Sequence, residues 1–91
     1  MMKFNLGRLV ITPAVLSTVP VDDICRAIDR HVCGQWGDVP DLVSVTNESG
    51  LLYGGHLLSA YRSMDGTELR VLTTADRLTT TVHLSFEPYE S

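Results

Sequence analysis

Apolar and polar residues alternate through three segments between His56 and Phe86, and two short turns separate these segments. The first turn contains Asp65-Gly66, a pair that favours a two-residue hairpin because glycine tolerates the positive φ that such a turn requires. The second turn lies at Ala75–Leu78. β-Branched residues fill the start of the third segment, Thr79–Val82, as is typical of a strand. The pattern predicts a three-stranded antiparallel meander.

The two turns determine the predicted registers. A two-residue first turn places Ala60 opposite Val71, and a four-residue second turn places Val71 opposite Val82. One face then collects seven apolar side chains: Leu58, Ala60, Leu69, Val71, Val82, Leu84 and Phe86. The other face is mostly polar and carries the row Tyr61, Arg70 and His83. Because a slip of one residue would exchange the faces and bury charge, the pattern favours this pairing.

Two segments are candidates for covering the apolar face. Pro20–Val32 has apolar residues at helical spacing and two aspartates in its first turn, which predicts the main helix. Gly34 follows as a typical helix stop. The segment 41–53 is compatible with a helix or a short strand, and Ser49-Gly50 weakens either interpretation.

The N-terminal segment Lys3–Ile11 also alternates and predicts a strand at the edge of the sheet. Its partner is either the strand at 56–64 or the strand at 79–86. Thr12-Pro13 then predicts the start of a short helix. Ninety-one residues accommodate one core, so residues 1–91 are expected to form a single domain. The expected class is α+β, a three- to four-stranded antiparallel sheet with one face packed by one or two helices.

The charge pattern argues against direct binding of nucleic acid. The formal net charge is −4, from 11 acidic and 7 basic residues, and the basic residues do not cluster. A sequence-independent nucleic-acid binder normally shows a basic stripe. No segment is long enough to cross a membrane, and none is expected to bind one.

The side chains that usually carry chemistry are sparse. Cys25 and Cys33 are eight residues apart on or near one helix, beyond disulfide reach, and are interpreted as reduced thiols of a cytoplasmic protein. They lack the tight spacing of zinc ligands, so neither a metal nor another cofactor is expected. No Ser-His-acid or Cys-His-acid set is indicated locally, which favours a non-enzymatic protein.

Seven residues are candidates for an interaction surface, each beside a structural alternative. Trp36 and Asp38 lie in the loop Gly34–Asp38, where Trp36 either covers one end of the core or anchors a partner. Asp76 and Arg77 either form the second turn or take part in recognition. The row of Tyr61, Arg70 and His83 is either a solvated sheet face or a shallow patch for a partner or an anion.

The chain resembles a family of small, uncharacterised bacterial proteins that are often found on plasmids and other mobile elements. The resemblance covers nearly the whole chain and rests on the following motifs: Phe4-Asn5-Leu6-Gly7 with Thr12-Pro13, His31 with Gly34-Gln35-Trp36-Gly37-Asp38, Leu57-Leu58-Ser59-Ala60-Tyr61, Asp65-Gly66-Thr67, Thr73-Thr74-Ala75-Asp76-Arg77 and Thr80-Thr81. The family's Asn is matched by Asn47, while Leu42–Val45 replaces a charged stretch and Phe86–Tyr89 is a shuffled form of the family's ending. The family has no established activity, so the resemblance implies this architecture and a mobile-element origin.

These observations together predict a small cytoplasmic protein that acts by binding another protein. Its most concrete form is an inhibitor of a host defence system, of the anti-CRISPR kind. One alternative is a small-molecule or anion-binding module, or a weak enzyme, that uses Tyr61, Arg70 and His83. Another is a homodimer as the functional unit, with the polar sheet face or Trp36 at its interface.

Overall fold

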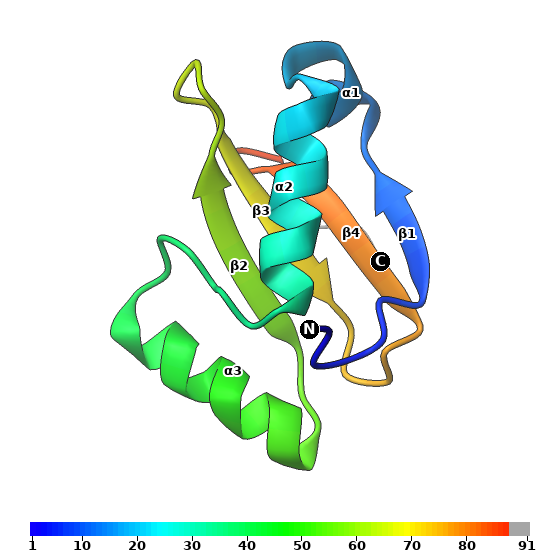
Figure 1. The fold of residues 1–91 in the computed structure, drawn as a ribbon, viewed down its shortest axis with the longest axis vertical. Coiled ribbons are helices and arrows are strands. Elements are labelled where there is room, and N and C mark those ends of the chain that lie inside the picture. The colour runs from blue at the N-terminus through cyan, green and yellow to red at the C-terminus, as the bar shows by residue number, and fades with distance from the viewer. Residues whose placement is uncertain (88–91) are drawn as a thin grey trace.

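The computed structural model describes residues 1–87 and shows an α+β fold, as the pattern predicts (Figure 1). Of the short C-terminal tail that the sequence predicts at 87–91, residues 88–91 lie outside this described part of the chain. The elements in chain order are β1 (Arg8–Ile11), α1 (Pro13–Thr18), α2 (Val21–Val32), α3 (Asp41–Tyr53), β2 (Leu57–Arg62), β3 (Glu68–Thr73) and β4 (Thr79–Leu84). The four strands form one sheet in the order β1-β4-β3-β2. None of the helices in this part of the chain is long and apolar enough to cross a membrane.

The hairpin of β3 and β4 has the predicted register. Val71 lies opposite Val82 and Leu69 lies opposite Leu84. The backbone N–H of Thr74 donates to the carbonyl of Thr79 at 3.0 Å, which closes the four-residue loop.

The register predicted for β2 and β3 is wrong by one residue. Ser59, and not Ala60, lies opposite Val71, and Tyr61 lies opposite Leu69. The loop has three residues, because the N–H of Ser63 donates to the carbonyl of Thr67 at 2.9 Å. Asp65 favours this longer loop by accepting from the N–H of Thr67 at 3.0 Å and from the hydroxyl of Ser63.

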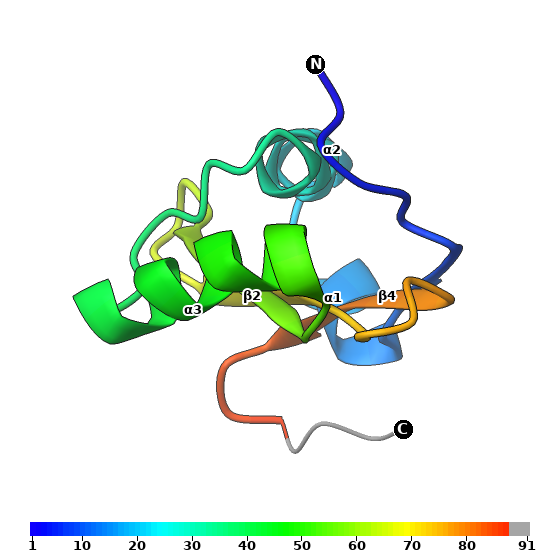
Figure 2. The same ribbon diagram turned by 90° about the horizontal axis from the view of Figure 1, so that it is seen from below.

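The one-residue slip changes the composition of the apolar face. Helix α2 packs on one side of the sheet, and the chain after β4 runs along the other side (Figure 2). The buried core between helices and sheet consists of Val15, Val19, Ile24, Ala27, Tyr61, Leu69, Val71, Val82 and Leu84. Leu58 and Ala60, predicted on this face, lie on the opposite one, and Phe86 is 78% exposed beyond the end of β4. Tyr61, which was predicted on the polar face, lies in the core opposite Leu69, and Ser59 takes the place that Ala60 was predicted to fill.

An antiparallel sheet was predicted, and the pairings β2–β3 and β3–β4 are antiparallel, but strand β1 makes the sheet mixed. It pairs in parallel with β4, from Arg8 opposite Thr79 to Ile11 opposite Val82, and thus selects the second of the two predicted partners. The strand starts at Arg8 and not at Lys3. Gly7, just before it, has a φ of 66°, and a Cβ there would lie 2.4 Å from the carbonyl carbon of Leu78. The chain therefore enters the sheet through a close approach that only glycine permits.

The segment 41–53 is a helix, and it covers the edge of the sheet beside β2 (Figure 2). Its Asn47 side chain donates to the carbonyl of Leu58 at 2.7 Å and accepts from the N–H of Leu58 at 3.0 Å. Along the same edge, the N–H of Ala60 donates to the carbonyl of Trp36, and the carbonyl of Ala60 accepts from the N–H of Asp38. An amide side chain and a short extended segment thus occupy the edge that another strand would otherwise pair with.

Candidate functional site

His31 is the centre of a buried hydrogen-bond network between α2 and the sheet. Its side chain is fully buried, with Nδ1 at 2.5 Å from the Ser59 hydroxyl and Nε2 at 2.9 Å from the Thr73 hydroxyl. The Thr73 hydroxyl lies 2.7 Å from that of Thr80, which donates to the carbonyl of Leu6 at 2.7 Å. Every buried side-chain nitrogen and oxygen among the described residues has a hydrogen-bond partner.

The direction of each hydrogen bond in this network determines which ring nitrogen of His31 carries the proton. A hydroxyl has one proton, and the Thr80 proton points to the Leu6 carbonyl, so Thr80 accepts the proton of Thr73. Thr73 therefore accepts from Nε2–H of His31, and the bare Nδ1 accepts from Ser59. Burial, and secondly the charge of Arg77, lowers the pKa of His31 from 6.5 to about 4, so the ring is neutral at pH 7.

An aromatic cluster packs over His31 and fixes the position of α3. The rings of Phe4 and Trp36 meet the imidazole edge-on at centroid distances of 5.2 and 5.8 Å. Trp36 is 5% exposed, and its Nε1–H donates to Glu48 of α3 at 2.8 Å. The structure thus agrees with the alternative in which Trp36 covers the core.

Arg77 ties the second turn to the C-terminal end of α3. Its guanidinium donates to the carbonyls of Gly50 at 2.9 Å and Gly55 at 2.6 Å, and it lies 5.7 Å from the ring centre of Phe4. The neighbouring Asp76 accepts from the hydroxyl of Thr74 at 2.7 Å and from the N–H of Leu78 at 3.0 Å, and these hydrogen bonds lower its pKa. Both residues have structural roles in the turn, as one of the two interpretations predicts.

The predicted row of Tyr61, Arg70 and His83 does not form. Tyr61 points to the helix side because of the register slip, and its hydroxyl donates to the carbonyl of Gln35. Burial raises the pKa of Tyr61. Arg70 and His83 do lie opposite one another on the other face, where His83 is 6% exposed. The seven candidate residues therefore do not share one surface.

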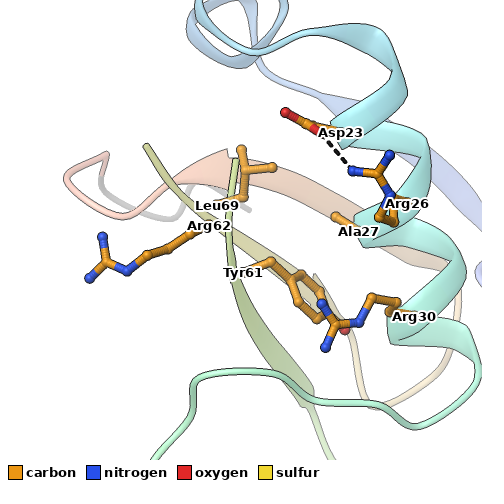
Figure 3. Close-up of a pocket in the computed structure, with 7 residues that line it drawn as sticks. All are labelled: Asp23, Arg26, Ala27, Arg30, Tyr61, Arg62 and Leu69. Atoms are coloured by element: carbon orange, nitrogen blue, oxygen red, sulfur yellow. Dashed lines mark hydrogen bonds and ion pairs between the residues drawn. The ribbon is translucent and has the colours of Figure 1, made fainter. Parts of the chain in front are cut away.

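Three arginines border a shallow hollow between α2 and β2. It has a volume of about 30 Å³ and is lined by Asp23, Arg26, Ala27, Arg30, Tyr61, Arg62 and Leu69 (Figure 3). Arg26 pairs with Asp23 at 2.7 Å, and the guanidinium of Arg30 lies 4.8 Å from the ring centre of Tyr61. Arg62 points away from the other two arginines (Figure 3). The hollow has room for little more than water.

Helix α3 has an exposed apolar surface, its outer face, which we define as Leu42, Val45, Ser49, Leu52 and Tyr53. Its four apolar side chains are 64–83% exposed. At about 100° per residue, the five positions fall within about 100° of arc, so they form one stripe. The sheet-facing side of α3 carries the buried Asn47 and Gly50. The outer face of α3 is therefore apolar and exposed, whereas the sheet-facing side is buried.

Within residues 1–87, no group of three or more His, Cys, Asp or Glu side chains is placed to hold a metal ion. Fold and surface together define a small α+β protein with a buried histidine and an uncovered apolar helix face. No protein-family model, curated protein or solved structure matches the chain.

Proposed function

We propose that this protein is non-enzymatic and acts by binding another protein through the outer face of α3. The observation that carries the proposal is the exposure of Leu42, Val45, Leu52 and Tyr53 on one side of a helix. Fully burying an apolar side chain of this size contributes about 1.5–3 kcal/mol, so a fitting partner would gain from all four. Exposed apolar patches of this kind commonly mark interaction sites.

The way α3 is held supports this role. Three different segments anchor the helix: Trp36 binds Glu48, Arg77 binds the carbonyl of Gly50, and the backbone of Leu58 binds Asn47. A helix fixed in this way presents its outer face without further ordering, which lowers the entropic cost of association. Amphipathic helix faces dock into apolar grooves by such i, i+3, i+7 anchors.

The most concrete form of the proposal is a cytoplasmic inhibitor of a host defence system, of the anti-CRISPR kind. Small size, net acidity and the resemblance to mobile-element proteins support it. A plasmid-interference assay tests it: expression of the protein in a host with an active CRISPR system should restore transformation by a targeted plasmid. Unchanged transformation across the defence types tried would argue against this form.

The binding proposal itself is tested by affinity capture with a matched pair of variants. Wild-type protein and Leu16→Glu should capture the same stoichiometric partner, whereas Val45→Glu should lose it. Leu16 is 59% exposed on α1, away from α3, so it controls for adding a charge at an exposed apolar site (Figure 1). Equal capture by Val45→Glu would exclude this face.

Arg30, at the rim of the hollow, supports a second candidate, binding of an anion at the protein surface beside the hollow. This site replaces the predicted anion site at Tyr61, Arg70 and His83, whose side chains lie on two faces. Within residues 1–87, Arg30 and Arg62 border the hollow and form no ion pair with an acidic side chain, whereas Arg26 is neutralised by Asp23. A phosphate-dependent rise in Tm that Arg30→Gln abolishes would favour this candidate over protein binding.

A further inference from the structure

We propose that the partner of the outer face of α3 is a basic protein surface, with an apolar stripe for the exposed side chains of the helix and lysine or arginine residues along one side of that stripe. The inference deepens the proposed function and rests on it, because it concerns the same helix face. It adds the charge of the partner and the side on which that charge lies.

Acidic residues line one margin of the outer face. At about 100° per residue, Asp41 and Glu48 lie about 20–40° beyond Leu52, on the same side of the helix, and both are exposed. Asp38, also exposed, precedes the helix in the segment whose Trp36 donates to Glu48 at 2.8 Å, so this segment lies on that side of the helix. We define the acidic margin as Asp38, Asp41 and Glu48.

The opposite margin is uncharged. Thr46 lies there, about 20° beyond Tyr53, and its hydroxyl donates to a backbone carbonyl of the helix at 2.8 Å. Residues 31–61 contain no lysine or arginine. The guanidinium of Arg77 is bound to two backbone carbonyls at the C-terminal end of α3. The outer face is therefore asymmetric, with an apolar centre, an acidic margin on one side and a neutral margin on the other.

The acidic margin is not neutralised within the described part of the chain. Among residues 1–87, the side chains of Asp38 and Asp41 form no hydrogen bond or ion pair, and Glu48 is bound only by the neutral indole of Trp36. Three exposed carboxylates beside an apolar stripe complement a cationic surface, and such charges chiefly steer the encounter and fix its orientation. The same carboxylates, in a protein of net charge −4, disfavour nucleic acid, an anionic membrane or a second copy as the occupant.

Three synthetic amphipathic helical peptides test the inference. They share one leucine stripe and differ only along its sides, which carry lysine, glutamine or glutamate. Isothermal titration should show one-to-one binding of the lysine peptide, weaker binding of the glutamine peptide and no binding of the glutamate peptide, and added salt should narrow these differences. The amide chemical shifts that the lysine peptide changes should map to α3, and Val45→Glu should abolish its binding.

Two double variants separate the acidic margin from the net charge. Asp38→Asn/Asp41→Asn and Asp22→Asn/Asp29→Asn each remove two exposed carboxylates, and the second pair lies on α2. The first double variant should weaken binding of the lysine peptide by about two- to thirtyfold, the effect of two exposed ion pairs. The second should leave the affinity nearly unchanged. Circular dichroism establishes that each variant is folded.

Equal binding of the three peptides at α3 would overturn the inference and leave the proposed function standing, since the apolar face would still bind. Equal effects of the two double variants, lysine-peptide binding that Val45→Glu retains, or no peptide binding at α3 would overturn it as well. Failure of the proposed function is seen separately, in a partner that Val45→Glu captures as well as the wild type does.

Discussion

The side chain of Asn47 completes both backbone hydrogen bonds of Leu58 on the open edge of β2, with distances of 2.7 and 3.0 Å. A side-chain amide has the same donor and acceptor as a peptide group, so one residue replaces part of a neighbouring strand. The contact also joins α3 to the sheet, because Asn47 lies at the middle of the helix. The helix face proposed to bind partners is therefore held in place from its opposite side.

Replacing Asn47 by leucine should destabilise the protein by about 2–6 kcal/mol, because two part-buried backbone groups of Leu58 lose their partners at about 1–3 kcal/mol each. Asn47 is 1% exposed, so water cannot readily take its place. Urea denaturation followed by Trp36 fluorescence measures the loss. Ser49→Ala, on the exposed side of the same helix, should change stability by less than about 0.5 kcal/mol. Equal stabilities of the two variants would contradict the role of Asn47.

The pKa of His31 predicts how stability depends on pH. The imidazole has a pKa of about 4 when folded and an ordinary value of 6.5 when unfolded, so the unfolded chain binds the extra proton between these values. The stabilisation is complete above pH 6.5 and is lost as the pH falls toward 4, by about 3 kcal/mol in total. Below pH 4, stability should fall further, since hydrogen bonds lower the pKa values of Asp65, Asp76 and Glu87.

Urea midpoints measured at a series of pH values check this dependence. The loss between pH 6.5 and 4 should disappear in a folded His31→Gln variant and persist in His56→Gln, which removes an exposed imidazole. A wild type with constant stability over this range would show that His31 is not held neutral by burial.

The hydrogen-bond network around His31 predicts the tautomer of this residue independently of its pKa. At pH 7, nitrogen chemical shifts should identify Nε2 as protonated and Nδ1 as bare, because Thr73 is left to accept and Ser59 to donate. Thr73→Val keeps the shape but leaves the Nε2–H without its acceptor, which should cost about 1–3 kcal/mol. A proton found on Nδ1 would contradict the assigned directions of the hydrogen bonds around His31.

Sequence patterns determined one hairpin and not the other, for a reason visible in β2. In β3 and β4, the buried leucines and valines stand at alternate positions that face one side of the sheet, so their burial defines the register; they are Leu69, Val71, Val82 and Leu84. In the segment 57–61, apolar residues occur at odd and at even positions, so both faces of the strand carry them. A slip of one residue therefore only exchanges one apolar set for the other. The register of β2 against β3 depends on the hydrogen bonds of the Asp65 side chain in the loop, and the pattern of apolar residues contains no information about them.

The candidate sites were difficult to predict for the same reason. His31 was visible only as an isolated histidine, because Ser59, Thr73 and Thr80 gather around it from three strands only in the correct register. The outer face of α3 needed the decision between helix and strand for 41–53. Once the segment is helical, the spacing of its apolar residues reveals the stripe.

Two glycines with positive φ provide a controlled test of the segment that covers the edge of β2. Gly37 has a φ of 76°, and a Cβ there would lie 2.1 Å from the carbonyl oxygen of Ala60, a backbone atom that cannot rotate away. Gly54 has a φ of 88° with nothing within 4 Å of its Cβ position. Gly54→Ala should therefore cost only the backbone strain, about 1–3 kcal/mol. Gly37→Ala adds a steric clash and should cost about 3 kcal/mol or more.

Hydrogen exchange separates these two contributions. In Gly37→Ala, the amides of Asp38 and Ala60 should lose protection, because the hydrogen bonds between the 36–38 segment and β2 must open to relieve the clash. In Gly54→Ala, those amides should stay protected. Equal losses of stability in the two variants, with the Ala60 amide still protected in both, would mean that the segment does not pack against β2 as closely as the distance implies.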